Sequence, residues 1–366
     1  MKTLISGIAF LFLFSLQLMA QDSLKFTLAD FYNSNPLLDA KVEQVFNSIP
    51  DGIRVAQMIM PAAGKLGKST EHVSRLIREG KIGGAILLNG TKTLFKKLAH
   101  DFDSTALANG GLPLLFSADA ELSLINMKIK ETQKVKYANK IRSIETLQKE
   151  TMKICTELNQ MGIQWNFAPV VDLSPNATVS FRSFGLNKDT IIQFSDEFIR
   201  LSQKNNIVAT AKHFPGHGYV TGDTHKQLVF IDGEMKEVDV YKPLIKNGVI
   251  SIMVGHIAVK NNPKYNTDGL PSTVSKVIVS GLLRGDLGFK GIIITDAMGM
   301  GGVASVPHCG LKAAQAGCDV ILMPKDEDEV HADIMAEIQK DENFKTQVYE
   351  SVKRIIRLKI CLGMIK

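Results

Sequence analysis

The stretch Ile207-Val208-Ala209-Thr210-Ala211-Lys212-His213-Phe214-Pro215-Gly216-His217-Gly218 joins a short apolar run to a loop rich in histidine and glycine. Residues 207–211 are typical of a strand buried on both faces of a parallel sheet, because the run is short, apolar and bounded by turn residues. The polar side chains therefore gather where the strand ends. The chain continues through Gly222 to Asp223 and His225. Glycines leave the backbone free to move, so we predict a mobile flap that closes over a ligand.

This concentration of titratable groups favours a functional interpretation. A single histidine, such as His213 or His217, is more often a hydrogen-bonded core residue than a functional one. Burying several histidines, a lysine and an aspartate in one short segment is costly unless the groups are paired or used. The segment is therefore the first candidate for the chemistry of the chain.

Seven other apolar runs resemble residues 207–211 and alternate with helical stretches such as 146–161 and 188–205. The runs are residues 57–60, 84–88, 113–118, 164–171, 251–254, 291–295 and 318–323. Eight strand–helix units predict the α/β class and, within it, a single-domain (β/α)8 barrel of the TIM type. An open doubly wound sheet also alternates, but it usually has fewer strands, and no glycine-rich dinucleotide fingerprint follows the first run.

Charged residues follow five of the predicted strands. They are Asp119 and Glu121 after the third, Asp172 after the fourth, Lys212 and His213 after the fifth, His256 after the sixth and Asp296 after the seventh. The carboxyl ends of the strands of such a barrel share one face, where barrel enzymes place their active sites. We therefore expect these side chains to converge on one pocket.

The amino-terminal segment has the layout of a secretory signal peptide. Lys2 precedes an apolar stretch, and Met19-Ala20-Gln21-Asp22 ends it with a small residue before a polar one. We predict a signal peptide over residues 1–20 with cleavage after Ala20, a linker over 21–37 and the barrel over 38–366. An uncleaved membrane anchor is the alternative. Export places the protein in the periplasm or outside the cell.

Composition excludes several classes of partner. Removing Lys2 with the signal peptide lowers the net charge from +6 to +5, and only 7% of residues are aromatic, so no nucleic-acid footprint is visible. No other segment is long and apolar enough for stable membrane insertion after cleavage. The four cysteines lack metal-ligand spacing. We expect a monomer that needs no metal and no organic cofactor.

Five motifs together carry a resemblance to a known family. They are the loop quoted above, Gly162-Ile163-Gln164-Trp165-Asn166-Phe167-Ala168-Pro169-Val170-Val171-Asp172, Arg182-Ser183-Phe184-Gly185, Ile252-Met253-Val254-Gly255-His256 and Ile294-Thr295-Asp296-Ala297-Met298. In this order they closely resemble the catalytic barrel of glycoside hydrolase family 3. Within that family the single-domain β-N-acetylglucosaminidases are the most similar.

The resemblance implies a role for each matching residue. Asp296 is similar to the family's nucleophile, and Asp223 with His225 stands where the hexosaminidase branch has its acid/base dyad. Asp119, Arg182, Lys212 and His213 match positions that hold sugar hydroxyls, and Asp172 matches a residue of the pocket structure. The chemistry is consistent: a retaining glycosidase needs a carboxylate nucleophile and a proton donor, and a histidine of ordinary pKa ~6.5 can be that donor.

One departure from the family pattern concerns the residues after Asp119. The family usually has a glycine where this chain has Ser123, and an arginine that contacts the sugar where this chain has Met127. Lys128 is a possible substitute, although on a helix one position turns a side chain by about 100°. Either the set of sugar-holding residues is altered or the local helix has a different register.

The sequence thus predicts a retaining exo-β-N-acetylglucosaminidase that acts on peptidoglycan fragments or chitin-type oligosaccharides. A β-N-acetylglucosaminide phosphorylase and a sugar-binding barrel with weakened catalysis are alternatives. Another is a metal hydrolase with ligands from His213, His217, His225, His256 and Asp296. Asp296 taken alone is also compatible with a helix cap near Met298.

Overall fold

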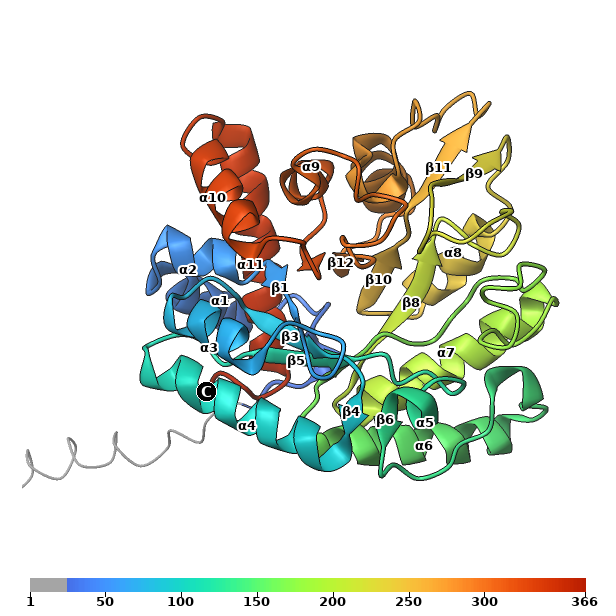
Figure 1. Cartoon of the computed structure of the whole chain (residues 1–366), viewed down its shortest axis with the longest axis horizontal. Helices are drawn as coiled ribbons and strands as arrows, with labels where there is room; N and C mark the ends of the chain where they lie inside the picture. The colour runs from blue at the N-terminus through green and yellow to red at the C-terminus, as the bar shows by residue number, and fades with distance from the viewer. Residues whose placement is uncertain (1–24) are drawn as a thin grey trace, which may run out of the picture.

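A curled parallel sheet of seven strands forms the centre of the protein (Figure 1). The structure is a computed structural model that describes residues 25–366, so the predicted signal peptide lies outside the described residues. The strands in spatial order are β12 (Ile292–Thr295), β10 (Ser251–Val254), β8 (Val208–Phe214), β7 (Trp165–Asn166), β5 (Leu115–Ala118), β3 (Gly84–Leu87) and β2 (Ala62–Ala63). Each strand lies beside its predecessor in this sheet, so the chain winds in one direction.

Each of the eight predicted apolar runs contains a strand. The remaining two, β1 (Ile59–Met60) and β13 (Ile321–Leu322), pair in parallel with each other as a separate two-stranded sheet. The α/β class is therefore confirmed, in the form of a curled parallel sheet. The described strands do not form one closed eight-stranded sheet, so the structure does not show the closed barrel that the sequence predicts.

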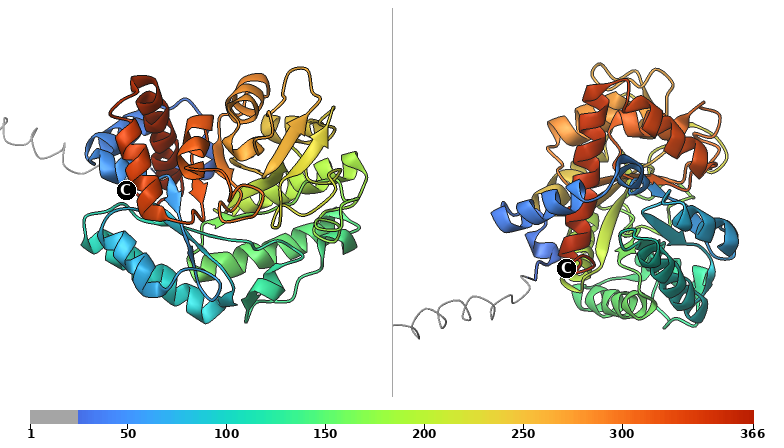
Figure 2. Two further views of the ribbon diagram at one scale, coloured as in Figure 1. Left: turned by 45° about the horizontal axis from the view of Figure 1, so that its top comes forward. Right: turned by 90° about the vertical axis from the view of Figure 1, so that its left-hand side faces the viewer.

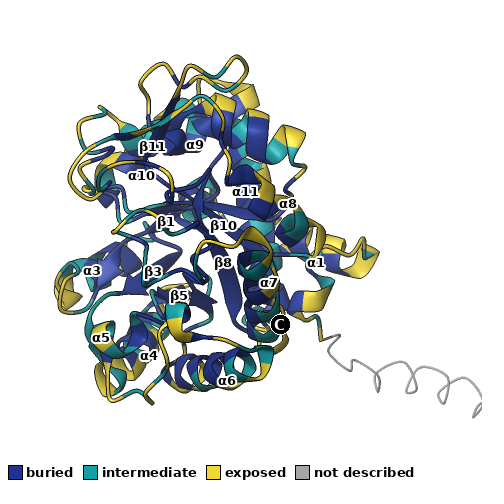
Figure 3. Cartoon of the chain, turned by 90° about the vertical axis from the view of Figure 1, so that its right-hand side faces the viewer, coloured by how far each residue is buried: buried dark blue, intermediate teal, exposed yellow. Residues whose placement is uncertain are grey.

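The strands are buried as the apolar runs predict. All seven residues of β8 are buried, and so are all four residues of β3, β5, β10 and β12. Helices cover the outward face of the sheet, and their own outer faces are exposed (Figure 3). One boundary differs from the prediction, because β8 continues to Phe214. Lys212 and His213 therefore lie within the strand rather than after it.

The helices begin and end at residues with clear capping roles. In α6 (Ile144–Met161) the Ser143 side chain accepts a hydrogen bond from the Thr146 N–H, and Gly162 ends the helix with a φ of 72°. The last helix, α11 (Glu342–Cys361), lies against α1 (Pro36–Asn47), which brings the two ends of the described chain together (Figure 2). The other α-helices are α2 (Asp51–Ala56), α3 (Thr70–Arg78), α4 (Lys92–Ala108), α5 (Ile125–Lys128), α7 (Lys188–Lys204), α8 (Val238–Lys246), α9 (Cys309–Ala316) and α10 (Glu327–Glu337).

Two short parallel pairs lie outside the central sheet. The pair β9 (Val229–Asp232) and β11 (Ile257–Lys260) joins the segments that follow β8 and β10, and β4 (Gly90–Thr91) pairs with β6 (Ile129–Lys130). None of these four strands was expected from the sequence. Within residues 25–366, no helix combines the length and apolar character needed to cross a bilayer.

Candidate active site

Asp296 lies at the carboxyl end of β12. Its N–H donates to the Val254 carbonyl of the neighbouring strand, and its Oδ1 accepts a hydrogen bond of 2.8 Å from the Ala297 N–H. Burial alone would raise the pKa of Asp296, but the imidazole of His213 and the Ala297 N–H bring it below its ordinary value. The helix-cap interpretation is wrong, because the next helix, α9, begins only at Cys309. Asp296 is thus an ionised carboxylate at a strand end.

Five charged side chains form a network around the ends of β5 and β8, which we call the strand-end cluster. The cluster consists of Asp119, Glu121, Lys128, Arg182 and Lys212. The Lys212 ammonium lies 2.9 Å from Asp119 Oδ1 and 2.7 Å from Glu121 Oε1. Arg182 forms a bidentate pair with Glu121, with N–O distances of 2.9 and 2.7 Å. Three of the predicted substrate-binding residues are therefore held together by ion pairs.

The strand-end cluster compensates its buried charges internally. Glu121 and Lys212 each expose only 2% of their side chains. Burial would raise the pKa of Glu121, but Arg182 and Lys212 outweigh it and bring the pKa to about 2. Asp119 behaves in the same way, because Lys128 and Lys212 overcome its burial and hold its pKa far below the ordinary value. The cluster contains three cationic side chains and two carboxylates, a formal excess of one positive charge.

The structure shows which side chain lies beside Asp119, where the family usually has an arginine. The helix α5 is a single turn that ends at Lys128, and the Lys128 ammonium lies 2.6 Å from Asp119 Oδ2. Met127 instead points outward with 45% of its surface exposed. The side chain that contacts Asp119 is therefore the lysine that follows the usual arginine position. The Ser123 hydroxyl, at the usual glycine position, is buried and donates to the Phe181 carbonyl beside Arg182.

His213 belongs to a second network, around Asp172. The ladder between β8 and β10 pairs Lys212 with Met253 and Phe214 with Val254, so it skips His213. Such a bulge redirects side chains, and here it allows neighbouring residues to serve two networks of one site. His213 Nδ1 lies 2.7 Å from Asp172 Oδ2, while Asp172 Oδ1 accepts the backbone N–H groups of His213 and His217. His213 is only 7% exposed.

Glu237, at the start of α8, is hydrogen-bonded to the loop that follows His213. Its buried carboxyl group accepts hydrogen bonds from the backbone N–H groups of Leu173, Gly218 and Tyr219. A side chain at position 218 would lie 1.6 Å from the Leu173 carbonyl oxygen, so only glycine fits there. Burial and the nearby Asp172 carboxylate raise the pKa of Glu237 to about 8. The loop geometry thus depends on a residue that lies some twenty positions away.

The predicted acid/base dyad is present but exposed. His225 Nδ1 lies 2.7 Å from Asp223 Oδ1, and the His225 side chain is 60% exposed. Burial would raise the pKa of Asp223, but hydrogen bonds from His225 lower it, so the aspartate is an ionised acceptor and Nδ1 carries the proton. The other ring nitrogen, Nε2, remains available for proton transfer.

The dyad's loop is bonded to the loop that follows Asp296. The backbone N–H groups of Gly301 and Gly302 donate to the carbonyl oxygens of His225 and Thr224, at 3.1 and 3.0 Å. A Cβ atom on Gly301 would lie 2.3 Å from the Lys226 carbonyl oxygen, and one on Gly302 would lie 2.8 Å from His256 Cβ. The structure therefore joins the two loops that carry the predicted nucleophile and the predicted acid.

The four histidines do not form a metal site with Asp296. His213 and His225 each contact an aspartate. His217 Nε2 lies 3.2 Å from the Thr224 hydroxyl. The two nitrogens of His256 face the Thr273 hydroxyl and the Ala297 carbonyl. Among residues 25–366, the one group of three potential ligands close enough to share an ion is His308, Glu329 and Asp333. That group is at the surface and contains no predicted site residue, so the geometry does not support the metal-hydrolase alternative.

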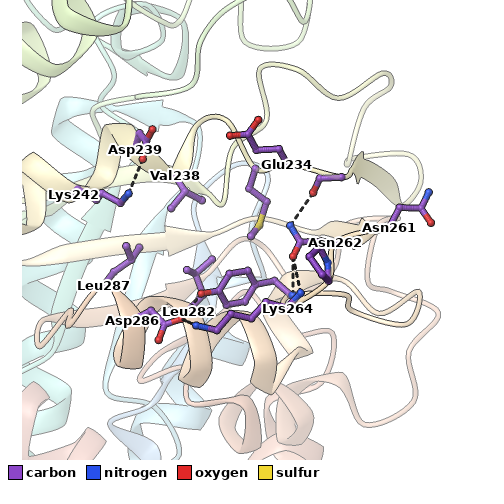
Figure 4. Close-up of a pocket in the computed structure, with 14 residues that line it drawn as sticks. Glu234, Val238, Asp239, Lys242, Asn261, Asn262, Lys264, Leu282, Asp286 and Leu287 are labelled. Atoms are coloured by element: carbon purple, nitrogen blue, oxygen red, sulfur yellow. Dashed lines mark hydrogen bonds and ion pairs between the residues drawn. The ribbon is translucent and has the colours of Figure 1, made fainter.

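A surface pocket of about 750 Å³ lies between α8, the segment after β11 and the π-helix Val277–Asp286 (Figure 4). Some of its polar groups pair with one another: Asn262 bonds to the Gly233 carbonyl, and Lys264 pairs with Asp286. None of the predicted site residues lines it. We therefore assign the active site to the strand ends and not to this pocket.

Comparison with known proteins identifies the family of the chain. Residues 52–358 match the family described as "Glycosyl hydrolase family 3 N terminal domain". A beta-N-acetylglucosaminidase/beta-glucosidase of Cellulomonas fimi is 30% identical over 317 residues, covering 80% of this chain and 55% of that protein. A beta-hexosaminidase of Photobacterium profundum is 30% identical over 263 residues, covering 68% of this chain and 76% of that protein.

A solved structure extends the comparison to the fold. The beta-N-acetylhexosaminidase from Beutenbergia cavernae matches with a TM-score of 0.75 and 25% identity, over 84% of this chain and 97% of that one. The chain belongs to glycoside hydrolase family 3. It spans little more than half the length of the Cellulomonas fimi relative.

The site also contains residues to which sequence reasoning gave no role. Glu121 follows Asp119 by two positions, and that spacing at a strand end was a usable signal. Glu237 gave no such signal, because its partners are backbone N–H groups of distant loops.

Proposed function

We propose that the protein is a retaining, exo-acting β-N-acetylglucosaminidase that removes terminal β-linked N-acetylglucosamine. The observation that carries this proposal is the pair of hydrogen bonds between the Asp223–His225 loop and the loop after Asp296, which supports a carboxylate and an imidazole acting on the same substrate. Family membership supports the reaction class. The names of the relatives, which are beta-hexosaminidases and beta-N-acetylglucosaminidases, support the sugar.

The reaction proceeds in two steps. Asp296 attacks the anomeric carbon and forms a glycosyl ester, while His225 gives its Nε2 proton to the leaving glycosidic oxygen. His225 then removes a proton from a water molecule, which attacks the same carbon and releases Asp296. Asp223 stabilises the charged imidazole and fixes its tautomer, because its carboxylate accepts the Nδ1 proton throughout.

The remaining predicted residues hold the sugar. Asp119, Lys212 and Arg182 lie at the ends of β5 and β8 and in the segment before α7, and His213 lies on the inner side of the Asp172 network. Their ion pairs fix these side chains before a ligand arrives, so little side-chain entropy is lost on binding.

The proposal also includes the closure of the barrel and the location of the protein. The pair β1–β13 completes a closed single-domain (β/α)8 barrel over residues 38–366. Its support is that the Thr295 N–H donates to the Val320 carbonyl on one side and the Gly83 N–H donates to the Ile59 carbonyl on the other. We also propose that the protein is exported, on the strength of the amino-terminal sequence. We propose further that it acts as a monomer on peptidoglycan fragments or chitin-type oligosaccharides.

A panel of p-nitrophenyl β-glycosides that differ only in the sugar tests this function. We expect the N-acetylglucosaminide to be hydrolysed with the highest kcat/KM, and chelation with EDTA to leave the rate unchanged. The assay is repeated with phosphate, because the phosphorylase alternative predicts N-acetylglucosamine 1-phosphate as the product. Release of only free N-acetylglucosamine under both conditions excludes phosphorolysis, and no release from any glycoside refutes the proposal.

A further inference from the structure

Lys128 is the cation of the strand-end cluster that a ligand reaches most easily. Its side chain is 26% exposed, compared with 12% for Arg182 and 2% for Lys212. The Asp119 carboxylate that it contacts is itself 18% exposed. The exposed edge of the cluster is therefore the Lys128–Asp119 pair, and the Glu121–Lys212–Arg182 part lies behind it.

Counting hydrogen bonds shows unused capacity at this edge. An ammonium group has three N–H donors. Lys212 uses two of them, on Asp119 and Glu121, whereas Asp119 is the only acceptor within hydrogen-bonding distance of Lys128 in the described part of the chain. Two donors of Lys128 remain free, and each Asp119 oxygen keeps one lone-pair position.

A donor beside an acceptor is the complement of a hydroxyl group. A sugar hydroxyl can accept a hydrogen bond from an ammonium and at the same time donate its own proton to a carboxylate. Hydrogen bonds to charged groups are the stronger kind. The Lys128–Asp119 pair thus has the chemistry to hold one hydroxyl of a sugar ring in a fixed position.

We propose that Lys128 and Asp119 together bind one hydroxyl of the terminal sugar, which makes Lys128 a specificity-determining residue. This inference depends on the proposed function, since it names a contact within the same substrate site. A lysine is a single point of donation, whereas a planar guanidinium can hold two neighbouring hydroxyls at once. The effect of Lys128 should therefore be greatest at the one hydroxyl that it shares with Asp119.

The test combines protein variants with altered substrates. Wild type and Lys128→Ala are assayed on p-nitrophenyl β-N-acetylglucosaminide and on its 3-deoxy, 4-deoxy and 6-deoxy analogues. We expect Lys128→Ala to raise KM about tenfold or more with a smaller change in kcat, which is the size of one lost hydrogen bond to a charged group. In wild type one deoxy analogue should show a similar loss, and in Lys128→Ala that analogue should lose little more.

Two further variants separate binding from folding. Lys128→Arg keeps the charge and should recover most of the affinity for the parent substrate, and Met127→Ala, at the exposed neighbouring position, should match wild type. The melting temperature of each variant, followed by circular dichroism, reports on folding.

Each outcome decides the inference. A normal KM for Lys128→Ala, or an equal loss on the parent and all three deoxy substrates, overturns it while wild-type hydrolysis keeps the proposed function. If wild type hydrolyses none of the four substrates, the proposed function fails and the inference fails with it. A loss confined to one hydroxyl, recovered by Lys128→Arg, supports both.

Discussion

The two sides of the active site are built in opposite ways. The strand-end cluster is largely buried, and its side chains are joined into one network by ion pairs, whereas the Asp223–His225 dyad is an exposed pair on a loop. Lys212 exposes 2% of its side chain and His225 exposes 60%. The difference indicates that the side proposed to hold the sugar is fixed by the sheet, while the side proposed to transfer protons depends on a loop and its contacts.

Asp296 is the group that both sides serve, so its loss should have the largest effect. Asp296→Asn leaves an amide that cannot form the glycosyl ester, and we expect turnover to fall by about a thousandfold or more. Release of p-nitrophenol from the N-acetylglucosaminide measures it. A variant that keeps more than about a tenth of the activity while folding normally would assign the nucleophile elsewhere.

The exposed side should be sensitive to chemistry rather than to stability. His225→Ala removes the proton donor, so turnover should fall about a hundredfold or more on substrates with poor leaving groups, such as phenyl or methyl glycosides. The loss should be much smaller on the 2,4-dinitrophenyl glycoside, whose leaving group needs little protonation. Equal losses across this series would contradict the assignment of the acid.

One chemical change made on both sides compares them directly. Glu121→Gln removes a buried charge from Lys212 and Arg182, so we expect it to lower the free energy of unfolding by about 3–5 kcal/mol. Asp223→Asn makes the same carboxylate-to-amide change in the exposed dyad and should cost about 1 kcal/mol or less. Urea denaturation at pH 7 measures both, and equal costs would remove the distinction between the two sides.

The buried side should also respond to acid. Arg182 and Lys212 overcome burial and lower the pKa of Glu121 from 4.5 to about 2, so its contribution to stability is present above pH 4.5 and is lost as the pH falls toward 2. This shift corresponds to about 3 kcal/mol. Over that window the unfolding free energy of Glu121→Gln should fall less steeply than that of wild type. Parallel curves would mean that Glu121 is not the titrating group.

The smallest effect is expected at Met127. Because Met127 points outward, Met127→Arg places the family's arginine at its usual sequence position but outside the site. KM should change by no more than about twofold, as for other surface substitutions. A tenfold decrease in KM would instead show that position 127 reaches the sugar, and that Lys128 is not the only residue on this edge.

The strand ends could be predicted from the sequence because their signals are local. Short apolar runs such as 251–254 mark buried strands, and a charged residue directly after each run marks the site. The same reasoning found Asp296, Asp119 and His213 without any knowledge of how the strands pair. It placed the end of β8 three residues early, because Lys212 and His213 are polar and yet lie within a fully buried strand.

The remaining features depend on contacts between distant segments. Glu237 is hydrogen-bonded to the loop that follows His213, and nothing near it in the sequence indicates that partner. Lys128 reaches Asp119 because α5 stops after one turn, a length that the sequence does not indicate. The strands β9 and β11 were missed because part of each is exposed and neither forms a long apolar run.

Gly301 and Gly302 limit how this enzyme can change during evolution. Even one added methyl group at position 301 would collide with a main-chain oxygen of the neighbouring loop, and the imidazole would be displaced although no catalytic side chain had been altered. Larger residues at positions 301 and 302 would inactivate the protein although none of the proposed catalytic side chains had changed. We therefore expect a descendant that keeps Asp296 and His225 but has larger residues in place of Gly301 and Gly302 to bind sugar without cleaving it.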